Sequence, residues 1–190
     1  MIALYGGAFD PPHNGHVALL EAARQALEPD ECVIAVTAVP PHKHVETPSI
    51  VRLELARAAF PGDTVILDEQ GRTIDLLRAH PEWQEATFLI GADEFVDFPD
   101  WKEPEAVLGL VRLAVATRPG FPADRLEGAI RKLQRPDRIV RFDMEPVDIA
   151  SRDLRSRLDR GEDVHELVPE AVWNLIERGG LYGRRYTDLA

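Results

Sequence analysis

The chain has 190 residues, of which 45% are hydrophobic and 29% are charged, a balance that is typical of a folded globule and excludes a disordered or fibrous protein. Its 22 Lys and Arg residues face 33 Asp and Glu residues, giving a formal net charge of −11. That charge repels nucleic-acid phosphate in general, whereas a nucleotide site needs only a few focused cations. The length predicts a single domain, residues 1–190.

Cysteine content and the start of the chain bear on its location. The single cysteine, Cys32, excludes an intramolecular disulfide, and its place in the apolar run 32–36 predicts a buried thiol. A reducing cytoplasm fits this. No basic region precedes a leader-like apolar segment, and no apolar run approaches about 18 residues. We therefore expect neither export nor membrane spanning.

Apolar runs of strand length alternate with segments rich in helix formers along the whole chain. The predicted strands cover residues 2–5, 32–39, 64–67, 87–90, 113–117 and 139–142. Helices are predicted after the first strand up to about residue 29, and over 49–57, 73–79, 126–133, 151–158 and 170–178. This alternation predicts an α/β fold, a Rossmann-like doubly wound parallel sheet with a small helical C-terminal part.

The turn between the first strand and the first helix carries the strongest signal. Gly6 and Gly7 let the backbone come close to a ligand, and the free amides at the start of the next helix form an anion site. His13 and His16 follow in the same stretch. As core filler they would leave ring nitrogens in need of partners, so we expect both to point into the cleft with the amides. Phosphate is the predicted guest.

Two other interpretations of this stretch remain open. One is a helix-capping loop with incidental histidines, and the other is a metal site formed by the two histidines with Asp10. Zinc sites usually need three or four protein ligands, and no further His or Cys follows at motif spacing. The glycine pair, the segment 9–11 and the histidine pair within one short stretch favour phosphate, and no protein metal site is predicted.

Polar residues after the other strands are further candidates, because ligands of open parallel sheets bind at the carboxyl ends of the strands. Lys43 follows the second strand and is either a phosphate contact or a solvated loop lysine. After the fourth strand, Gly91 permits close approach, and Asp93 either accepts from a sugar or base or caps a helix. Trp101 either stacks on a flat heterocycle or covers the core, and spacing alone favours the core.

Two further stretches contain candidate residues: the helix predicted over 49–57 and a cluster near the C-terminus. Ser49 is a predicted helix cap, and Arg52 on that helix is either exposed or faces a ligand. Near the C-terminus, Ser151 as N-cap would leave the first-turn amides facing an anion, with Arg155 one turn further along the same side. Acidic residues interleave with the arginines of this region and disfavour a nucleic-acid stripe. Residues 181–182 are expected to dock.

The sequence predicts phosphoryl or nucleotidyl transfer between bound substrates. It offers two phosphate-binding helix starts, a histidine pair and a few cations, but no plausible nucleophile. Ser151 has no adjacent base in the sequence, and Cys32 is expected to be buried. Such chemistry depends on positioning and charge stabilisation more than on covalent participation.

The stretch 6–16 resembles the signature of the HIGH-type nucleotidyltransferase superfamily, and the likeness is greatest to its branch of bacterial nicotinate mononucleotide adenylyltransferases. It covers nearly the whole chain. Further matching stretches follow in the family's order: Pro40-Pro41-His42-Lys43, Arg52-Leu53-Glu54, Ile90-Gly91-Ala92-Asp93 with Trp101, Arg118-Pro119-Gly120, Ile149-Ala150-Ser151 with Arg155, and Leu181-Tyr182.

The resemblance implies transfer of AMP from ATP to nicotinate mononucleotide, giving deamido-NAD and pyrophosphate, with Mg²⁺ riding on the triphosphate. By this likeness the catalytic residues are His13, His16 and Arg155. The residues implied for ATP and its phosphates are Gly6, Gly7, Phe9, Gly15, His16, Lys43, Gly91, Ser151 and Arg155. Those implied for the mononucleotide are Lys43, Arg72, Thr73, Asp93, Trp101 and Arg118, with Trp101 stacked on the pyridine ring.

The sequence departs from the family pattern at three places. Ala150-Ser151-Arg152 stands where the family has Ser-Ser-Thr, and Ala8 stands where a hydroxyl residue is common. The third is Gln70-Gly71-Arg72-Thr73, where the family usually has a Ser-Tyr-Thr element that receives the nicotinate carboxylate. An arginine at this point pairs with a carboxylate, or the pocket accepts another mononucleotide.

Two alternative functions remain open. One is a related transferase that uses nicotinamide mononucleotide, phosphopantetheine or a phosphorylated sugar or alcohol as acceptor. The other is a catalytically idle nucleotide-binding protein, which the presence of both histidines disfavours.

Overall fold

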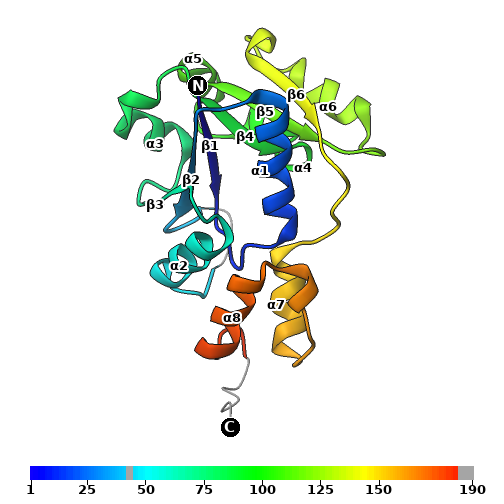
Figure 1. Cartoon of the computed structure of the whole chain (residues 1–190). Helices are drawn as coiled ribbons and strands as arrows, with labels where there is room; N and C mark the ends of the chain where they lie inside the picture. Colours follow the sequence, from blue (N-terminus) through cyan, green and yellow to red (C-terminus); the bar gives the residue numbers. More distant parts are fainter. Residues whose placement is uncertain (42–44, 184–190) are drawn as a thin grey trace.

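The computed structural model describes residues 1–41 and 45–183. Within these residues six parallel strands form one sheet, with helices on both of its faces (Figure 1). In chain order the strands are β1 (Ile2–Gly7), β2 (Glu31–Thr37), β3 (Thr64–Asp68), β4 (Thr87–Gly91), β5 (Arg112–Thr117) and β6 (Ile139–Asp143). The strands predicted from the apolar runs are thus confirmed, with ends that differ by up to two residues.

The strand order is β3-β2-β1-β4-β5-β6. The chain therefore builds outward from β1 in one direction and then continues on its other side from β4. In such a doubly wound sheet ligands bind at the carboxyl ends of the strands where the order reverses, which here is between β1 and β4. The predicted Rossmann-like fold class is confirmed.

The helices divide between the two faces of the sheet. They are α1 (Asn14–Leu27), α2 (Ser49–Ala59), α3 (Thr73–Ala79), α4 (Ala92–Phe95), α5 (Pro104–Leu110), α6 (Ala123–Ile130), α7 (Ser151–Asp159) and α8 (Glu170–Gly179). Buried residues of α1, α2, α7 and α8 belong to one core, and those of α3, α4, α5 and α6 to the other. Along β1, Ala3 and Tyr5 join the first core and Leu4 the second, as strand alternation requires.

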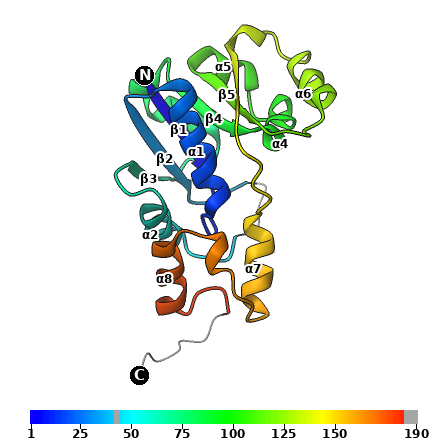
Figure 2. The same ribbon diagram turned by 45° about the vertical axis from the view of Figure 1, so that its right-hand side comes forward.

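The helical C-terminal part lies beyond the carboxyl ends of the strands. After β6 the chain crosses in extended form to α7, and α8 then packs against α2 (Figures 1 and 2). Buried Leu154 and Leu158 of α7 and Trp173 of α8 complete the first core. This placement brings a helix start from residue 151 to the edge of the sheet where the glycine turn leaves β1.

Two predicted helix caps are wrong. Pro48 precedes α2 and Ala150 precedes α7, so Ser49 and Ser151 are the first helical residues and not the caps. The Ser151 hydroxyl instead donates to the carbonyl oxygen of Pro11, outside its own helix. Helix α5 was not predicted, and α4 was anticipated only by the alternative that Asp93 caps a helix; that cap is wrong as well, because Gly91 precedes α4. None of the helices within residues 1–41 and 45–183 combines the length and the apolar character needed to cross a bilayer.

Candidate active site

The two histidines of the glycine turn stack at the start of α1. Their ring centroids are 3.7 Å apart, and Nδ1 of His16 accepts a hydrogen bond from the backbone N–H of His13 at 3.1 Å. A Cβ on Gly15 would lie 3.0 Å from the His13 ring, so a larger residue there would push the ring out of this arrangement. The spacing of the motif is therefore explained by packing of the two imidazoles on the first helical turn.

Burial sets the charge of His13. The residue is 7% exposed, and desolvation lowers the pKa of its imidazole to about 4. At neutral pH His13 is therefore uncharged and serves as a hydrogen-bonding group and not as a cation. Its Nδ1 is buried without a hydrogen-bond partner among the residues that the structure describes.

The start of α7 faces the glycine turn and is tied to it by two hydrogen bonds. Ser151 Oγ donates to the carbonyl oxygen of Pro11 at 2.9 Å, and an Nη of Arg155 donates to the carbonyl oxygen of Asp10 at 2.6 Å. A third bond runs from the Asn14 side chain to the carbonyl oxygen of Glu166 at 2.9 Å. The N-terminal motif and the C-terminal helices therefore form two walls of one site.

Between these walls lies a cleft of about 870 Å³, which we call the histidine cleft. That volume falls within the range of about 300–1,000 Å³ that holds cofactor-sized ligands. The cleft gathers residues that the sequence predicted for ATP from both ends of the chain: Gly6, Gly7, Phe9, His13, Gly15, His16, Gly91, Ser151 and Arg155. Phe9 is 1% exposed, and its ring packs between Tyr5 and Phe60, so it serves mainly to hold the turn in place.

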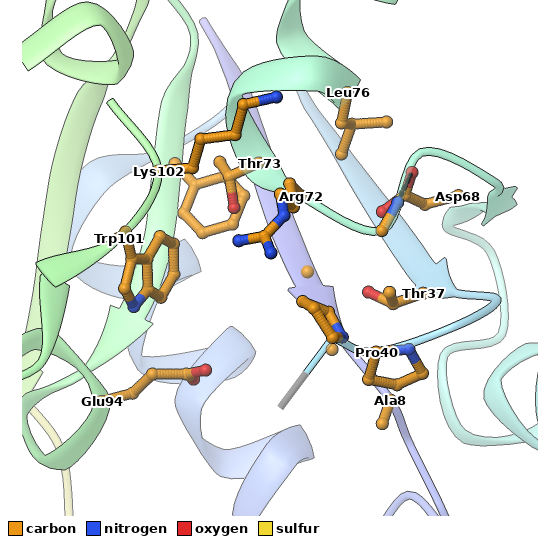
Figure 3. A pocket seen from close by; sticks show the side chains of 15 residues that line it. Ala8, Thr37, Pro40, Asp68, Arg72, Thr73, Leu76, Glu94, Trp101 and Lys102 are labelled. Carbon is orange, nitrogen blue, oxygen red and sulfur yellow. Dashed lines mark hydrogen bonds between the residues drawn. The ribbon is translucent and has the colours of Figure 1, made fainter. Parts of the chain in front are cut away.

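A second, smaller cavity of about 150 Å³ opens on the other side of the same turn, and we call it the indole pocket. Trp101 and Phe88 give it an aromatic wall, and Arg72 and Thr73 come from the start of α3 (Figure 3). The two cavities share four residues, Gly6, Gly7, Ala8 and Glu94. Two ligands bound in them would therefore meet at the glycine turn.

Arg72 lies at the centre of the indole pocket. Its guanidinium points into the cavity between Trp101 and Thr37 (Figure 3). Within the described ranges no carboxylate forms an ion pair with it, whereas Arg78 at the other end of α3 is paired with Glu103. A guanidinium without an ion-pair partner in a half-open cavity with an aromatic wall favours a bound anion.

The turn before Arg72 is fixed by a buried carboxylate. Asp68 is 4% exposed and accepts hydrogen bonds from the backbone N–H groups of Gln70 and Gly71, at 2.8 and 3.3 Å. Burial raises the pKa of this carboxyl group. Gly71 has a φ of +73°, and a Cβ there would lie 2.8 Å from the carbonyl oxygen of Val39. The departure Gln70-Gly71-Arg72 is thus a built turn with a required glycine.

Trp101 packs against the core, as spacing alone favoured, and its stacking on a heterocycle stays a prediction. Its ring packs edge-on against Phe98, at 5.3 Å between centroids, and against Phe88 at 6.5 Å. The same indole also lines the pocket that holds Arg72. One face of the side chain therefore belongs to the core, and the ring remains available to a flat ligand.

Arg52 takes neither of the two roles expected from the sequence. It is 1% exposed and donates to four carbonyl oxygens: those of Ala8, Thr37 and Ala38 at 2.7 Å each, and that of Thr47 at 3.1 Å. It therefore joins the glycine turn to the ends of the loop after β2. Its place in an apolar helix stripe gave no signal of this, because four carbonyl partners from separate segments are a tertiary feature.

The other predicted mononucleotide residues lie elsewhere. Asp93 and Arg118 form an ion pair of 3.0 Å between them and line the histidine cleft, not the indole pocket. Their position at the ends of β4 and β5 is the predicted one, but their cavity is not the one that holds Arg72, Thr73 and Trp101. Lys43 lies outside the described residues. Glu94, which the sequence did not single out, lines both cavities.

Comparison with known proteins gives the family. The model of the cytidylyltransferase-like family matches residues 4–169. This chain belongs to that family. The match spans β1 to the end of η4 (His165–Leu167) and so includes both walls of the histidine cleft.

Several members of the cytidylyltransferase-like family are similar over almost their whole length. A probable nicotinate-nucleotide adenylyltransferase from Rubrobacter xylanophilus is 33% identical over 196 residues, which is 95% of this chain and 91% of the relative. A probable nicotinate-nucleotide adenylyltransferase from Thermus thermophilus is 36% identical over 193 residues, or 95% of this chain and 98% of the relative.

A solved structure supports the same fold. The nicotinic acid mononucleotide adenylyltransferase of Plasmodium falciparum, complexed with NaAD, has a TM-score of 0.73 at 18% identity, and the match covers 98% of each chain. At that identity the likeness concerns the fold, and it agrees with the strand order described above.

No group of three or more His, Cys, Asp or Glu side chains within residues 1–41 and 45–183 is placed to hold a metal ion. The histidine cleft offers imidazole, hydroxyl, backbone amide and guanidinium groups, which are partners for phosphate oxygens.

Proposed function

We propose that this chain is a nicotinate-nucleotide adenylyltransferase, which transfers AMP from ATP to nicotinate mononucleotide and releases pyrophosphate. One observation carries the proposal: two cavities of different chemistry share the glycine turn at Gly6, Gly7 and Ala8. The larger cavity suits a triphosphate and the smaller one suits a flat, anionic ring. The relatives described above bear the name of this activity.

On the ATP side, the phosphates lie between the two walls of the histidine cleft. His16 and the neutral His13 donate hydrogen bonds from the start of α1, and Ser151 and Arg155 approach from α7. Arg155 brings the positive charge, because its guanidinium cannot be deprotonated in proteins. A single preorganised donor at developing oxyanion charge contributes about 2.7–4 kcal/mol to lowering the barrier.

The chemical step needs no nucleophile from the protein. A phosphate oxygen of the mononucleotide attacks the α-phosphorus of ATP, the new bond forms the dinucleotide, and the bond to the β-phosphate breaks to release pyrophosphate. The attacking oxygen is already anionic, so no general base is required. The protein contributes position and charge stabilisation at the shared edge of the two cavities.

On the acceptor side, the pyridine ring stacks on Trp101 in the indole pocket. Arg72 pairs with an anionic group of the mononucleotide, and the Thr73 hydroxyl lies beside it on the first turn of α3. The guanidinium favours the carboxylate of the nicotinate ring over the neutral amide of nicotinamide. The roles of Lys43, Asp93 and Arg118 toward the mononucleotide, and that of Gly91 toward ATP, stay predictions.

Nucleotidyltransferases of this family use a divalent metal ion with the nucleotide. We propose Mg²⁺, which prefers oxygen ligands and keeps several waters. The donors of the histidine cleft fit a cation held by the phosphate oxygens and by water, with no protein carboxylate cage. When bound it neutralises part of the triphosphate charge. A reducing cytoplasm is the proposed location, in keeping with the free and buried Cys32.

The experiment is a pyrophosphate-release assay with ATP and Mg²⁺ and a series of acceptors. We expect turnover with nicotinate mononucleotide and much less with nicotinamide mononucleotide, phosphopantetheine or sugar phosphates. His16→Ala should lower kcat by two orders of magnitude or more, since one oriented donor to the reacting phosphates is lost. Turnover only with a non-pyridine acceptor would refute the claim that nicotinate mononucleotide is the acceptor. The absence of turnover with any acceptor would refute the claim that the chain is a nucleotidyltransferase.

A further inference from the structure

The carboxylate of Asp10 is buried in the glycine turn and receives a hydrogen bond from the far end of the chain. Asp10 is 2% exposed, and its Oδ1 accepts from the hydroxyl of Tyr182 at 2.8 Å. Its Oδ2 lies 3.7 Å from an Nη of Arg155 and accepts no hydrogen bond within residues 1–41 and 45–183. The same Nη of Arg155 also donates to the backbone oxygen of Asp10.

Charge explains why a carboxylate is kept in this place. Asp10 stands near two guanidinium groups, that of Arg155 at the edge of the histidine cleft and that of the wholly buried Arg52. Burial lowers the pKa of Arg52, and the negative charge of Asp10 opposes that shift. A buried charge is tolerated when it is paired, so Asp10 compensates both cations at the base of the turn.

Tyr182 holds this carboxylate in its orientation. The residue follows α8, and its hydroxyl also interacts with the side chain of Thr47. Burial, and then the nearby charge of Asp10, raises the pKa of the phenol well above its usual range, so the hydroxyl stays protonated and donates. Leu181 packs against the first core beside it and fixes the backbone of this segment.

We propose that Tyr182 and Asp10 are positioning residues for Arg155. The hydroxyl of Tyr182 fixes one oxygen of the Asp10 carboxylate, and the other oxygen then restrains the guanidinium of Arg155 at the mouth of the histidine cleft. Tyr182 is in this way part of the ATP site, although none of the described residues after α8, 180–183, lines that cleft. This inference rests on the part of the proposed function that places ATP in the histidine cleft, and it does not depend on the identity of the acceptor.

A purely structural role for Tyr182 makes a different prediction. If the hydroxyl served only to attach the C-terminal segment, its loss would lower the stability of the protein whether or not Arg155 is present. If it acts through Arg155, its loss would lower ATP affinity only when the arginine is there to be misplaced. A double-mutant cycle separates these cases.

The test compares wild type, Tyr182→Phe, Arg155→Met and the double variant, with thermal unfolding recorded for each. Binding of α,β-methylene-ATP with Mg²⁺ is measured by calorimetry, and kcat and KM for ATP by pyrophosphate release. Losing a hydrogen bond to a charged group corresponds to about a tenfold effect, so Tyr182→Phe should weaken binding and kcat/KM about tenfold. In the Arg155→Met background, Tyr182→Phe should change neither the binding of the analogue nor kcat/KM.

Arg157→Met is the matched control, because Arg157 lies on the same helix but pairs with Glu162 at the exposed surface. Combined with it, Tyr182→Phe should keep its full tenfold effect. Equal losses in the Arg155→Met and Arg157→Met backgrounds, or no loss from Tyr182→Phe alone, would overturn the inference. Calorimetry needs no acceptor. If the wild type fails to turn over nicotinate mononucleotide, the proposed function is refuted, but the double-mutant cycle on ATP-analogue binding still tests the role of Tyr182.

Asp10→Asn provides a second variant that keeps the shape of the side chain. It removes the charge that faces Arg52 and Arg155, and the expected result is weaker ATP-analogue binding, again about tenfold. If Asp10→Asn is folded and binds the analogue as wild type does, the positioning role of the carboxylate is refuted. If it does not fold, the Tyr182 cycle carries the decision.

Discussion

Ser151 Oγ donates a 2.9 Å hydrogen bond to the carbonyl oxygen of Pro11, a residue 140 positions earlier in the chain. The bond joins the first turn of α7 to the turn that leaves β1. Because both helices begin at this point, their free backbone amides open toward the same cleft. The site is therefore built from two helix starts that the fold, and not the sequence order, brings together.

Ser151→Ala should weaken this junction. We expect a loss of about 1 kcal/mol in the free energy of unfolding, the usual value of one neutral hydrogen bond, and a several-fold fall in kcat/KM for ATP. Urea unfolding and pyrophosphate release measure the two effects. Ser156→Ala is the control, since Ser156 Oγ donates to the carbonyl oxygen of Arg152 in its own helix. Equal kinetics for the two variants would contradict the assigned role of Ser151.

Arg52→Met should be among the most damaging single changes outside the two cavities. It leaves four carbonyl oxygens without their donor, so we expect a loss of roughly 3 kcal/mol or more in the free energy of unfolding. Arg57→Met, on the same helix but exposed and paired with Glu54, should cost less than about 0.5 kcal/mol. Chemical denaturation of the two variants side by side gives the comparison, and similar midpoints would show that the carbonyl bonds contribute little.

His13 should make the protein less stable in mild acid. Its folded pKa of about 4 lies below the unfolded value of 6.5, so between these values the unfolded chain binds a proton that the native state does not. Stability is therefore complete above about pH 6.5 and falls as the pH is lowered toward 4. The expected loss is about 2 kcal/mol at pH 5 relative to pH 8.

The measurement for His13 is urea unfolding at both pH values for wild type and for His13→Gln, which does not titrate. The glutamine variant should lose about 2 kcal/mol less between pH 8 and pH 5 than wild type does. The same pH dependence in both proteins would mean that His13 takes up a proton in the folded state near its ordinary pKa.

Arg72→Gln should change the choice of acceptor. Loss of a charge-assisted bond to the ring carboxylate would lower kcat/KM for nicotinate mononucleotide by about 10- to 100-fold and leave that for nicotinamide mononucleotide nearly unchanged. Arg78→Gln, on the last turn of the same helix and paired with Glu103, is the control. An equal loss with both acceptors would instead place the guanidinium on the phosphate that they share.

Much of the fold follows from local patterns in the sequence. The apolar runs gave all six strands, because a strand that is covered on both faces needs continuous apolar residues. The glycine turn was placed correctly between β1 and α1. Helix α4 spans only four residues, too short for a periodic signal, and α5 has as many residues as the predicted α3 but follows Glu103, which is not one of the usual cap residues that mark a helix start. That residues 1–190 make one domain stays a prediction.

The candidate site was predictable where it depends on motifs and unpredictable where it depends on tertiary contacts. His13, His16, Ser151 and Arg155 do line one cleft. The four carbonyl partners of Arg52 come from three separate segments, which no spacing in the sequence reveals. Asp93 and Arg118 line the histidine cleft and not the indole pocket. That outcome depends on how the ends of β4 and β5 lie relative to the glycine turn, which the sequence does not reveal either.

Asp10 and Arg155 are separated by 145 positions in the sequence, and this separation affects how the site forms during synthesis. The glycine turn is synthesised among the first residues, yet the helix that completes its cleft emerges only when most of the chain has been made. An ATP site that needs both walls of the cleft therefore adds to the stability of the fold only after translation has almost ended.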